Sequence, residues 1–355
     1  MEESFYIRKV RKRSCGEAVE TKIFQSDQIN QAAALLRQGE LVAFPTETVY
    51  GLGANALLPE SVKQVFTVKG RPSDNPLIVH VADFSMTAEF VESYHPLTEK
   101  IVKHFWPGPL TLIFKIKEGS LNPVVTGGLS TAAFRMPDNK KTLSLIEKTD
   151  APLVGPSANT SGRPSPTTAL HVYHDLKGKI AGILDDGATQ IGVESTVLDL
   201  SGEVPTILRP GAVTQEALEE ILGIEVPLDK HLVKESETPK APGMKYKHYS
   251  PDTPVLMINS DDWEKALIWA EANDKKVGLL VTPKIADKYS SADRFVFADE
   301  TVEAATRGLF SGLRALDEAK KADIIFAEVF PEDHLGVAYM NRLKKAAAQN
   351  YFSEM

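Results

Sequence analysis

The sequence predicts an α/β protein with two domains, a larger one on a mixed sheet and a smaller three-layer one. The chain has 355 residues, which exceeds the size at which a single hydrophobic core usually stops growing. Short apolar runs alternate with amphipathic helical patterns, as is typical of α/β sheets. Residues 225–252 interrupt this alternation with prolines and many charges. We therefore place one domain at 1–224, a linker at 225–252 and a second domain at 253–355.

The sequence of the first domain predicts helices that alternate with short strands. Patterns with a helical period predict helices at residues 29–37, 61–68, 97–105, 167–176 and 215–222. Short apolar runs predict strands at residues 41–44, 77–81, 110–116, 131–135, 153–155, 180–184, 196–200 and 206–208.

The second domain repeats the alternation on a smaller scale. Strands are expected at 255–258, 277–281, 295–297 and 324–326, and helices at 262–272, 302–320 and 337–348. About a hundred residues of this pattern are typical of a Rossmann-like three-layer domain.

Composition narrows the class of protein. Hydrophobic residues make up 43% and charged residues 25%, as in ordinary globular proteins. One cysteine excludes a disulfide framework within the chain, and we expect a cytoplasmic protein. No apolar run approaches 18 residues, so no membrane span is expected. The net charge of −8 argues against long contacts with a nucleic-acid backbone, although a local basic patch stays open.

Several familiar site motifs are missing from the sequence. There is no Walker A string. The glycines of GLGANA lie seven residues past the preceding strand rather than at its end, which argues against a Rossmann dinucleotide loop. The single cysteine and the scattered histidines lack zinc spacing, so we predict no metal site made by protein ligands alone.

The stretch PTETVYGLGANA, residues 45–56, is the first positive signal. It follows an apolar strand and carries hydroxyls, a carboxylate and two glycines. Glycine allows close backbone approach, and threonine offers a hydroxyl to a small polar ligand. The competing interpretation is that Thr46 or Thr48 caps a helix, but no helical pattern begins until residue 61.

Four arginines lie one or two residues before a proline. They are Arg71, Arg135, Arg163 and Arg209. Proline stiffens the chain around itself, so a guanidinium presented there loses less entropy on binding. Two of these loops share the string GRPS, and further loops rich in Ser, Thr and Asn follow other strands. Ligands collect at strand ends in such sheets, so we expect one cleft for an anionic ligand.

Seven ordered strings carry a family resemblance. They are PTETVYGLGANA, KGRPSDNPLIVHV, FWPGPLTLI, FRMPD, GPSANTSGRPSPT, ESTVLDL and ILRPGA. Together they resemble the threonylcarbamoyl-AMP synthases with a YrdC-like domain. The linker ending in KYKHYSP and the second domain resemble the two-domain form of that family. The resemblance implies a YrdC-like twisted mixed sheet with a large cleft.

The resemblance also implies a reaction. L-threonine, bicarbonate and ATP would give threonylcarbamoyl-adenylate, pyrophosphate and water, with Mg²⁺ accompanying ATP, which makes the enzyme a nucleotidyltransferase. The product would serve threonylcarbamoylation of the tRNA adenosine beside the anticodon, performed by a separate transferase complex. Direct contact with tRNA is expected to be weak, and no membrane partner is expected.

Site residues follow from the resemblance, motif by motif. The implied threonine pocket holds Thr48, His80, Arg135 and Ser195. The implied ATP site holds Lys69, Arg71, Asn75, Thr131, Ser157, Asn159, Ser165, Arg209 and Tyr249. The role of Arg163 stays open.

The residue chemistry agrees with this reaction. Arg135 suits the carboxylate of threonine. A carbamate formed on the threonine amine is itself the nucleophile, so no serine–histidine pair is required. Catalysis would then be positioning and charge neutralisation, with Lys69 and Arg71 as the catalytic residues beside Arg209 and magnesium. We also expect the linker to fold across the cleft as a lid, with Tyr249 reaching the nucleotide.

Two alternatives belong to other classes. A YrdC-like domain could act as a non-catalytic RNA-binding or ribosome-maturation module, which the net acidity disfavours. A related domain occurs in carbamoyltransferases that use carbamoyl phosphate, but the zinc-type cysteines of those enzymes are missing from this sequence.

Overall fold

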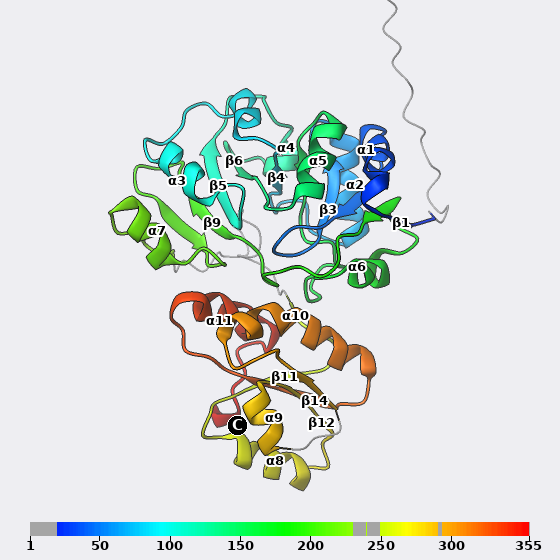
Figure 1. The fold of residues 1–355 in the computed structure, drawn as a ribbon, viewed down its shortest axis with the longest axis vertical. Helices are drawn as coiled ribbons and strands as arrows, with labels where there is room; N and C mark the ends of the chain where they lie inside the picture. Colours follow the sequence, from blue (N-terminus) through cyan, green and yellow to red (C-terminus); the bar gives the residue numbers. More distant parts are fainter. Residues whose placement is uncertain (1–19, 230–238, 240–248, 290–292, 355) are drawn as a thin grey trace, which may run out of the picture.

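The computed structural model describes residues 20–229, 239, 249–289 and 293–354. In these residues the chain forms two sheets, each with its own helices, stacked along the long axis of the molecule (Figure 1). The predicted α/β class is confirmed for both parts.

The first domain contains ten strands among the described residues. They are β1 (Lys22–Phe24), β2 (Val42–Phe44), β3 (Gly51–Asn55), β4 (Ile78–His80), β5 (Leu110–Lys115), β6 (Thr131–Arg135), β7 (Leu153–Val154), β8 (Gly182–Leu184), β9 (Thr196–Asp199) and β10 (Thr206–Arg209). The α-helices are α1 (Ile29–Arg37), α2 (Pro59–Lys69), α3 (Thr98–Phe105), α4 (Pro123–Thr126), α5 (Lys140–Thr149), α6 (Ala169–Leu176) and α7 (Gln215–Leu222). Two short 3₁₀ helices are η1 (Ser26–Gln28) and η2 (Phe84–Glu89).

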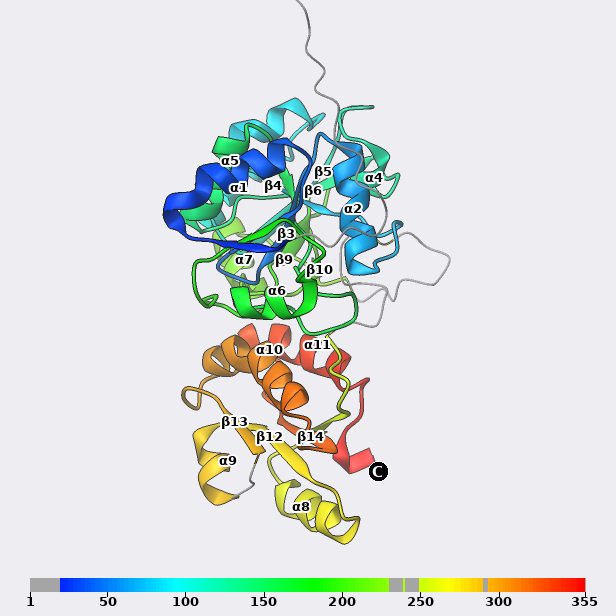
Figure 2. The same ribbon diagram turned by 90° about the vertical axis from the view of Figure 1, so that its right-hand side faces the viewer.

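The ten strands form one mixed sheet in the order β1-β8-β2-β3-β7-β4-β6-β5-β9-β10. The sheet contains parallel pairs, such as β4–β6 and β5–β9, and antiparallel pairs, such as β5–β6. The central strands are buried on both faces, since helices cover the sheet on two sides (Figure 2). This arrangement brings the ends of β4 and β6 together, with His80 opposite Arg135 in the register.

The second domain is a three-layer unit. Its strands β11 (Val255–Ile258), β12 (Val277–Val281), β13 (Asp293–Val296) and β14 (Ile324–Glu328) form a parallel sheet in the order β11-β14-β12-β13. Helices α8 (Trp263–Ala272) and α9 (Pro283–Lys288) share one apolar cluster with the sheet. Helices α10 (Val302–Ala319) and α11 (His334–Ala346) share another. A 3₁₀ turn, η3 (Phe352–Glu354), follows.

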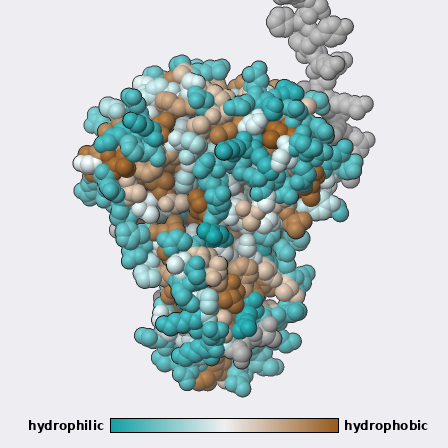
Figure 3. Space-filling view, in the orientation of Figure 1, coloured by the Kyte–Doolittle hydropathy of each residue, from teal (hydrophilic) through white to brown (hydrophobic). Residues whose placement is uncertain are grey.

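Helices α10 and α11 form the side of the second domain that faces the first (Figures 1 and 2). Their apolar cluster extends across the boundary and includes Val49 and Val193 of the first domain. The two domains therefore share buried apolar surface. The surface seen in Figure 3 is mostly hydrophilic, with separated hydrophobic patches.

The structure differs from the sequence prediction mainly around glycine. Residues 51–55, which we expected to be loop, form β3 and pair antiparallel with β2. A Cβ on Gly51 would lie 2.9 Å from the ring of Phe44, and one on Gly53 would lie 2.5 Å from the carbonyl of Val42. These glycines therefore let β3 pack closely on β2. The sequence prediction also missed β1, α4, α5 and α9.

The domain boundaries stay predictions. Val226, which we placed in the linker, is fully buried in the core of the first domain, and Leu228 forms a bridge with Ile207. Most of the expected lid, residues 230–238 and 240–248, lies outside the described residues.

Candidate functional site

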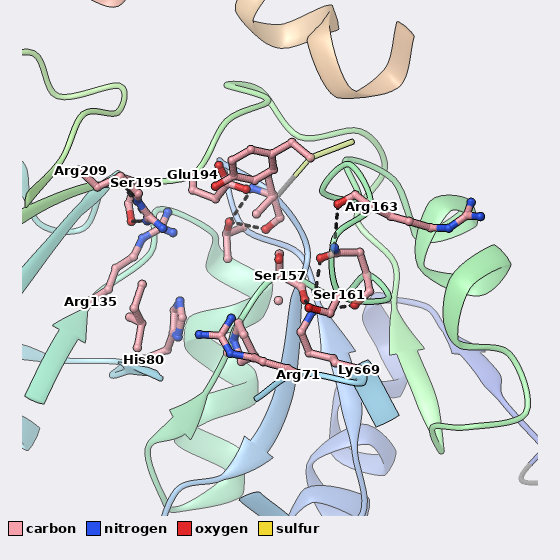
Figure 4. Close-up of a pocket in the computed structure, with 18 of the residues that line it drawn as sticks. Lys69, Arg71, His80, Arg135, Ser157, Ser161, Arg163, Glu194, Ser195 and Arg209 are labelled. Atoms are coloured by element: carbon pink, nitrogen blue, oxygen red, sulfur yellow. Dashed lines mark hydrogen bonds between the residues drawn. The ribbon is translucent and has the colours of Figure 1, made fainter. Parts of the chain in front are cut away.

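A cleft lies where loops from several strands of the first domain converge. It is lined by Thr46, Val49, Gly51, Lys69, Arg71, Ile78, His80, Arg135, Gly155, Pro156, Ser157, Asn159, Ser161, Gly162, Arg163, Glu194, Ser195, Arg209 and Tyr249. Most of the residues singled out from the sequence therefore meet in one place (Figure 4).

One end of the cleft is built around Arg135, the last residue of β6. Its side chain is only 4% exposed. Nη1 donates to the hydroxyl of Thr48 at 2.9 Å, Nε donates to the carbonyl of Gly108 at 3.3 Å, and Nη2 lies 2.8 Å from a carboxylate oxygen of Glu47. Among the described residues the guanidinium makes hydrogen bonds from Nη1 and Nε, whereas Nη2, although close to Glu47, makes none, so N–H bonds on Nη1 and Nη2 stay available to a ligand. A carboxylate suits such a pair.

Thr48 does not line the cleft itself but belongs to the wall behind it. Its hydroxyl lies 2.7 Å from that of Thr46, and the Thr46 hydroxyl accepts from the backbone N–H of Thr48 and Val49. This turn leads into β3, so the helix-capping interpretation does not apply. The loop instead holds Thr48 against Arg135.

His80, the last residue of β4, lies beside this end of the cleft. Burial and then the nearby charge of Arg135 lower its pKa to about 3, so the ring is neutral at physiological pH. Its edge packs against Phe44, and its buried Nδ1 has no hydrogen-bond partner among the described residues. A neutral imidazole in this position is available for a hydrogen bond to a ligand.

The other end of the cleft is cationic. Lys69, at the end of α2, is 2% exposed, and its ammonium donates to the carbonyls of Ser157 and Asn159. Burial, followed by the charge of Arg71, lowers the pKa of Lys69 well below its usual range. An arriving anion would favour the charged form. Arg71 also lines the cleft, and its Nη2 donates to the carbonyl of Pro76 at 3.2 Å.

A third wall comes from β9 and β10. The guanidinium of Arg209 donates to the carbonyl of Ser195 from Nε at 3.1 Å and from Nη2 at 2.9 Å. The Ser195 hydroxyl lies 2.8 Å from that of Thr111. Burial lowers the pKa of Arg209 to about 10, so it stays charged at neutral pH. A fixed positive charge therefore lies beside the Ser195 hydroxyl.

Ser165 and Glu194 link two loops of the cleft. The fully buried hydroxyl of Ser165 donates to the carboxylate of Glu194 rather than facing the cleft. Burial raises the pKa of Glu194, but Arg342 and Arg209 outweigh it, and the net shift is downward. Glu194 is therefore ionised in the folded protein.

Tyr249, from the end of the expected lid, lines the cleft. It adopts a positive φ of 66°, and its ring packs on Phe310 of α10 at 5.1 Å between centroids. Burial, followed by the charge of Glu194, raises its pKa to about 12, so the hydroxyl is protonated.

Asn75, Thr131 and Arg163, which the sequence also singled out, do not point into the cleft as the other lining residues do. Asn75 is 1% exposed, does not line the cleft, and its amide has no hydrogen-bond partner among the described residues. Thr131 begins β6 while Arg135 ends it, about 13 Å away along the strand, so Thr131 is not brought to the cleft. Arg163 lines the rim, but its side chain points away from the other labelled residues and pairs with Asp252 at 2.6 Å (Figure 4).

The sequence reasoning gave no role to Glu47 or Glu194. Both are buried carboxylates next to predicted site residues, and each pairs with an arginine, Glu47 with Arg135 and Glu194 with Arg342. Their signal in the sequence was a carboxylate beside a hydroxyl residue in the strings TET and EST.

Comparisons with known proteins agree with this site. A family model described as telomere recombination, of the Sua5, YciO and YrdC type, matches residues 34–211. A second, described as the C-terminal domain of threonylcarbamoyl-AMP synthase, matches residues 213–348.

Two curated relatives are called threonylcarbamoyl-AMP synthase. The Bacillus subtilis protein is 49% identical over 90% of this chain and 93% of its own length. The Pyrococcus abyssi protein is 45% identical over 90% of this chain and 94% of its own. The crystal structure of P. abyssi Sua5 complexed with L-threonine superposes with a TM-score of 0.87, at 43% identity, covering 93% of this chain and 99% of that one. The resemblance seen in the sequence is confirmed, and this chain belongs to the threonylcarbamoyl-AMP synthase family in its two-domain form.

Proposed function

We propose that this protein is a nucleotidyltransferase that makes L-threonylcarbamoyladenylate. It joins L-threonine, bicarbonate and ATP and releases pyrophosphate and water. One observation carries the proposal: a single cleft combines a carboxylate-binding end at Arg135 with a cationic end at Lys69 and Arg71. Family membership and the threonine-bound P. abyssi relative support the same assignment.

Threonine is proposed to bind at the Arg135 end. The N–H bonds of Nη1 and Nη2 that Arg135 does not use for hydrogen bonds among the described residues would take its carboxylate. The neutral ring of His80 and the hydroxyl of Ser195 line the same cleft and suit the amine and hydroxyl of the ligand. Thr48 acts from behind by holding the guanidinium.

ATP is proposed to bind across Ser157, Asn159, Arg209 and Tyr249, with its phosphates near Lys69 and Arg71. The buried ammonium of Lys69 already bridges two carbonyls of the loop at 157–159, so it fixes that loop as well as supplying charge. Ser165 supports the wall through Glu194. Asn75 is proposed as a further ATP contact, although its buried amide does not line the cleft. For Thr131 the structure offers no supporting contact with the cleft.

Catalysis is proposed to rest on positioning and charge. Bicarbonate and the threonine amine give a carbamate with loss of water, and a carbamate oxygen attacks the α-phosphorus of ATP as pyrophosphate leaves. Since the carbamate is the nucleophile, the protein has to hold two ligands in line and neutralise charge on the phosphates. Lys69, Arg71 and Arg209 supply that charge. The pKa of His80 is too low for the ring to carry a proton to the reaction at neutral pH.

Magnesium is proposed to arrive with the phosphates of ATP. Among the described residues no group of three or more His, Cys, Asp or Glu side chains is arranged to hold a metal ion. The two carboxylates near the cleft, Glu47 and Glu194, are already paired with arginines. This donor set fits a Mg²⁺ ion held mainly by phosphate oxygens, as is common for this metal, and the ion would neutralise phosphate charge there.

The product is proposed to pass to a separate tRNA threonylcarbamoyl transferase complex, in the cytoplasm. None of the helices in the described part of the chain combines the length and hydrophobicity needed to cross a membrane. The alternative of a non-catalytic RNA-binding module is not favoured, because the curated relatives are named as synthases and the net charge is −8. A salt titration of tRNA binding would reveal extensive backbone contacts.

The test is pyrophosphate release by the purified protein. We expect release only when threonine, bicarbonate, ATP and Mg²⁺ are all present. Release that does not need threonine or bicarbonate would contradict the proposal.

A further inference from the structure

Two buried arginines cross from the second domain into the loops of the cleft. Arg314 lies on α10 and is 3% exposed, and Arg342 lies on α11 and is 0% exposed. Both side chains donate hydrogen bonds to residues of the first domain. Neither side chain lines the cleft. A buried charge is costly unless it is well paired, so each of these arginines needs partners in the first domain.

Arg342 joins three segments of the cleft. Its Nε donates to the carboxylate of Glu194 at 3.1 Å, and its Nη2 donates to the backbone carbonyl of the same residue at 3.2 Å. Its Nη1 donates to the carbonyl of Pro210, next to Arg209. The other carboxylate oxygen of Glu194 accepts from Ser165. One guanidinium thus connects the loops that carry Ser165, Ser195 and Arg209.

Arg314 holds the neighbouring loop from its outer side. It makes a two-pronged contact with the carboxylate of Asp175, at 3.0 and 2.8 Å, and its Nη2 donates to the carbonyl of Pro164 at 2.6 Å. Asp175 in turn accepts from the backbone N–H of Thr160. This arrangement fixes both ends of the loop at 160–165.

We propose that Arg342 is a positioning residue for ATP binding, because it holds the loops at 160–165, 194–195 and 209–210 in one arrangement from the second domain. The inference rests on the proposed function of the cleft and extends it. The second domain would then take part in the first domain's chemistry through a buried ionic contact. Among the described residues Arg342 makes no hydrogen bond to the Arg135 end, and Ser195 is the one proposed threonine contact on a loop that it holds, so threonine binding should depend on Arg342 less than ATP binding does.

The experiment compares full-length variants. Arg342→Met keeps bulk but removes the charge and the hydrogen bonds, and Arg342→Lys keeps the charge alone. Arg307→Ala is the control, since Arg307, on α10, also bonds across the boundary, to the carbonyl of Gln190, and its hydrogen bond does not go to Glu194, Ser165 or Pro210. Binding of α,β-methylene-ATP and of L-threonine is measured by calorimetry, with Tm recorded for every protein.

We expect Arg342→Met to weaken binding of the ATP analogue at least about tenfold, a change of roughly 1.4 kcal/mol, with a clearly smaller change in the threonine Kd. Arg342→Lys should recover part of the loss, and Arg307→Ala should bind both ligands normally. Unchanged analogue binding in Arg342→Met, or equal loss of both ligands, would overturn the proposal. If Arg342→Met fails to fold, Arg342→Lys is judged by the same two affinities.

A double variant separates positioning from stability. Glu194→Gln with Arg342→Met removes both buried charges, so Tm should recover much of what Arg342→Met loses. Binding of the ATP analogue should stay weak, because the double variant still lacks the guanidinium that holds the three loops together. Recovery of analogue binding together with Tm would show that Arg342 serves stability alone. These measurements do not depend on turnover. A wild-type protein that binds the ATP analogue but releases no pyrophosphate would contradict the proposed function, while the role of Arg342 in ATP binding would still be tested by the affinities of the variants.

Discussion

Replacing Arg135 should weaken threonine binding, and the ion pair between Arg135 and Glu47 determines which variant can test this without unfolding the protein. The proposed carboxylate contact is a charge-assisted pair, whose loss costs roughly 1.5–3 kcal/mol, or about 10- to 150-fold in affinity. Arg135→Ala would also leave the carboxylate of Glu47, which is 6% exposed, without its ionic partner. Breaking a buried ion pair on one side typically costs about 3–5 kcal/mol of stability, enough to confuse a binding assay with unfolding.

The double variant Glu47→Gln with Arg135→Gln avoids that problem, because it removes both charges and keeps side chains of similar length. We expect its Tm to lie close to wild type and its threonine Kd to rise at least about tenfold. Isothermal titration with threonine gives the Kd, and α,β-methylene-ATP serves as the control ligand, which should bind normally. A well-folded double variant with wild-type threonine affinity would refute the assignment of Arg135.

Three further predictions concern the other walls of the cleft. Lys69→Ala and Arg71→Ala should each weaken ATP binding about tenfold or more while leaving the threonine Kd nearly unchanged; wild-type ATP titrations for both would remove them from the phosphate site. Tyr249→Phe keeps the packing on Phe310 but removes the hydroxyl, so the KM for ATP should rise, and an unchanged KM would place Tyr249 outside the nucleotide site. His80 has a folded pKa of about 3, below its unfolded value, so its contribution to stability is lost as pH falls from about 6.5 toward 3. His80→Gln should reduce the slope of unfolding free energy against pH by up to about 1.4 kcal/mol per unit between roughly pH 4.5 and 6.5, and an identical slope would contradict the buried neutral ring.

Local patterns predicted much of the fold, and the misses have physical causes. Helices α1 and α7 and strands β6, β11 and β12 have the bounds expected from their periodicity. Strand β3 was missed because glycine is a poor strand former, and its place depends on the ring of Phe44, which packs where side chains would otherwise be. A short helix such as α4, four residues long, carries too little periodicity to detect.

The site was predicted from motifs, whereas its supports were not. Nine of the thirteen residues assigned to the site line the cleft, because loops at strand ends of one sheet converge. The partners of Glu194 and Asp175 lie in the second domain, with Arg342 148 positions from Glu194 and Arg314 139 positions from Asp175. Local sequence patterns cannot predict an ion pair between residues so far apart in the chain. The structure places two arginines of the second domain, Arg314 and Arg342, directly behind the cleft.

The identity of the nucleotide product tests the central claim most directly. The wild-type protein is incubated with ATP, Mg²⁺, L-threonine and ¹³C-bicarbonate, and the adenylates are identified by mass spectrometry. The account predicts an adenylate that contains threonine plus one carbon from the labelled bicarbonate, formed together with pyrophosphate. An adenylate of threonine without the labelled carbon, or pyrophosphate release with AMP alone under conditions where threonylcarbamoyl-adenylate is stable, would contradict it.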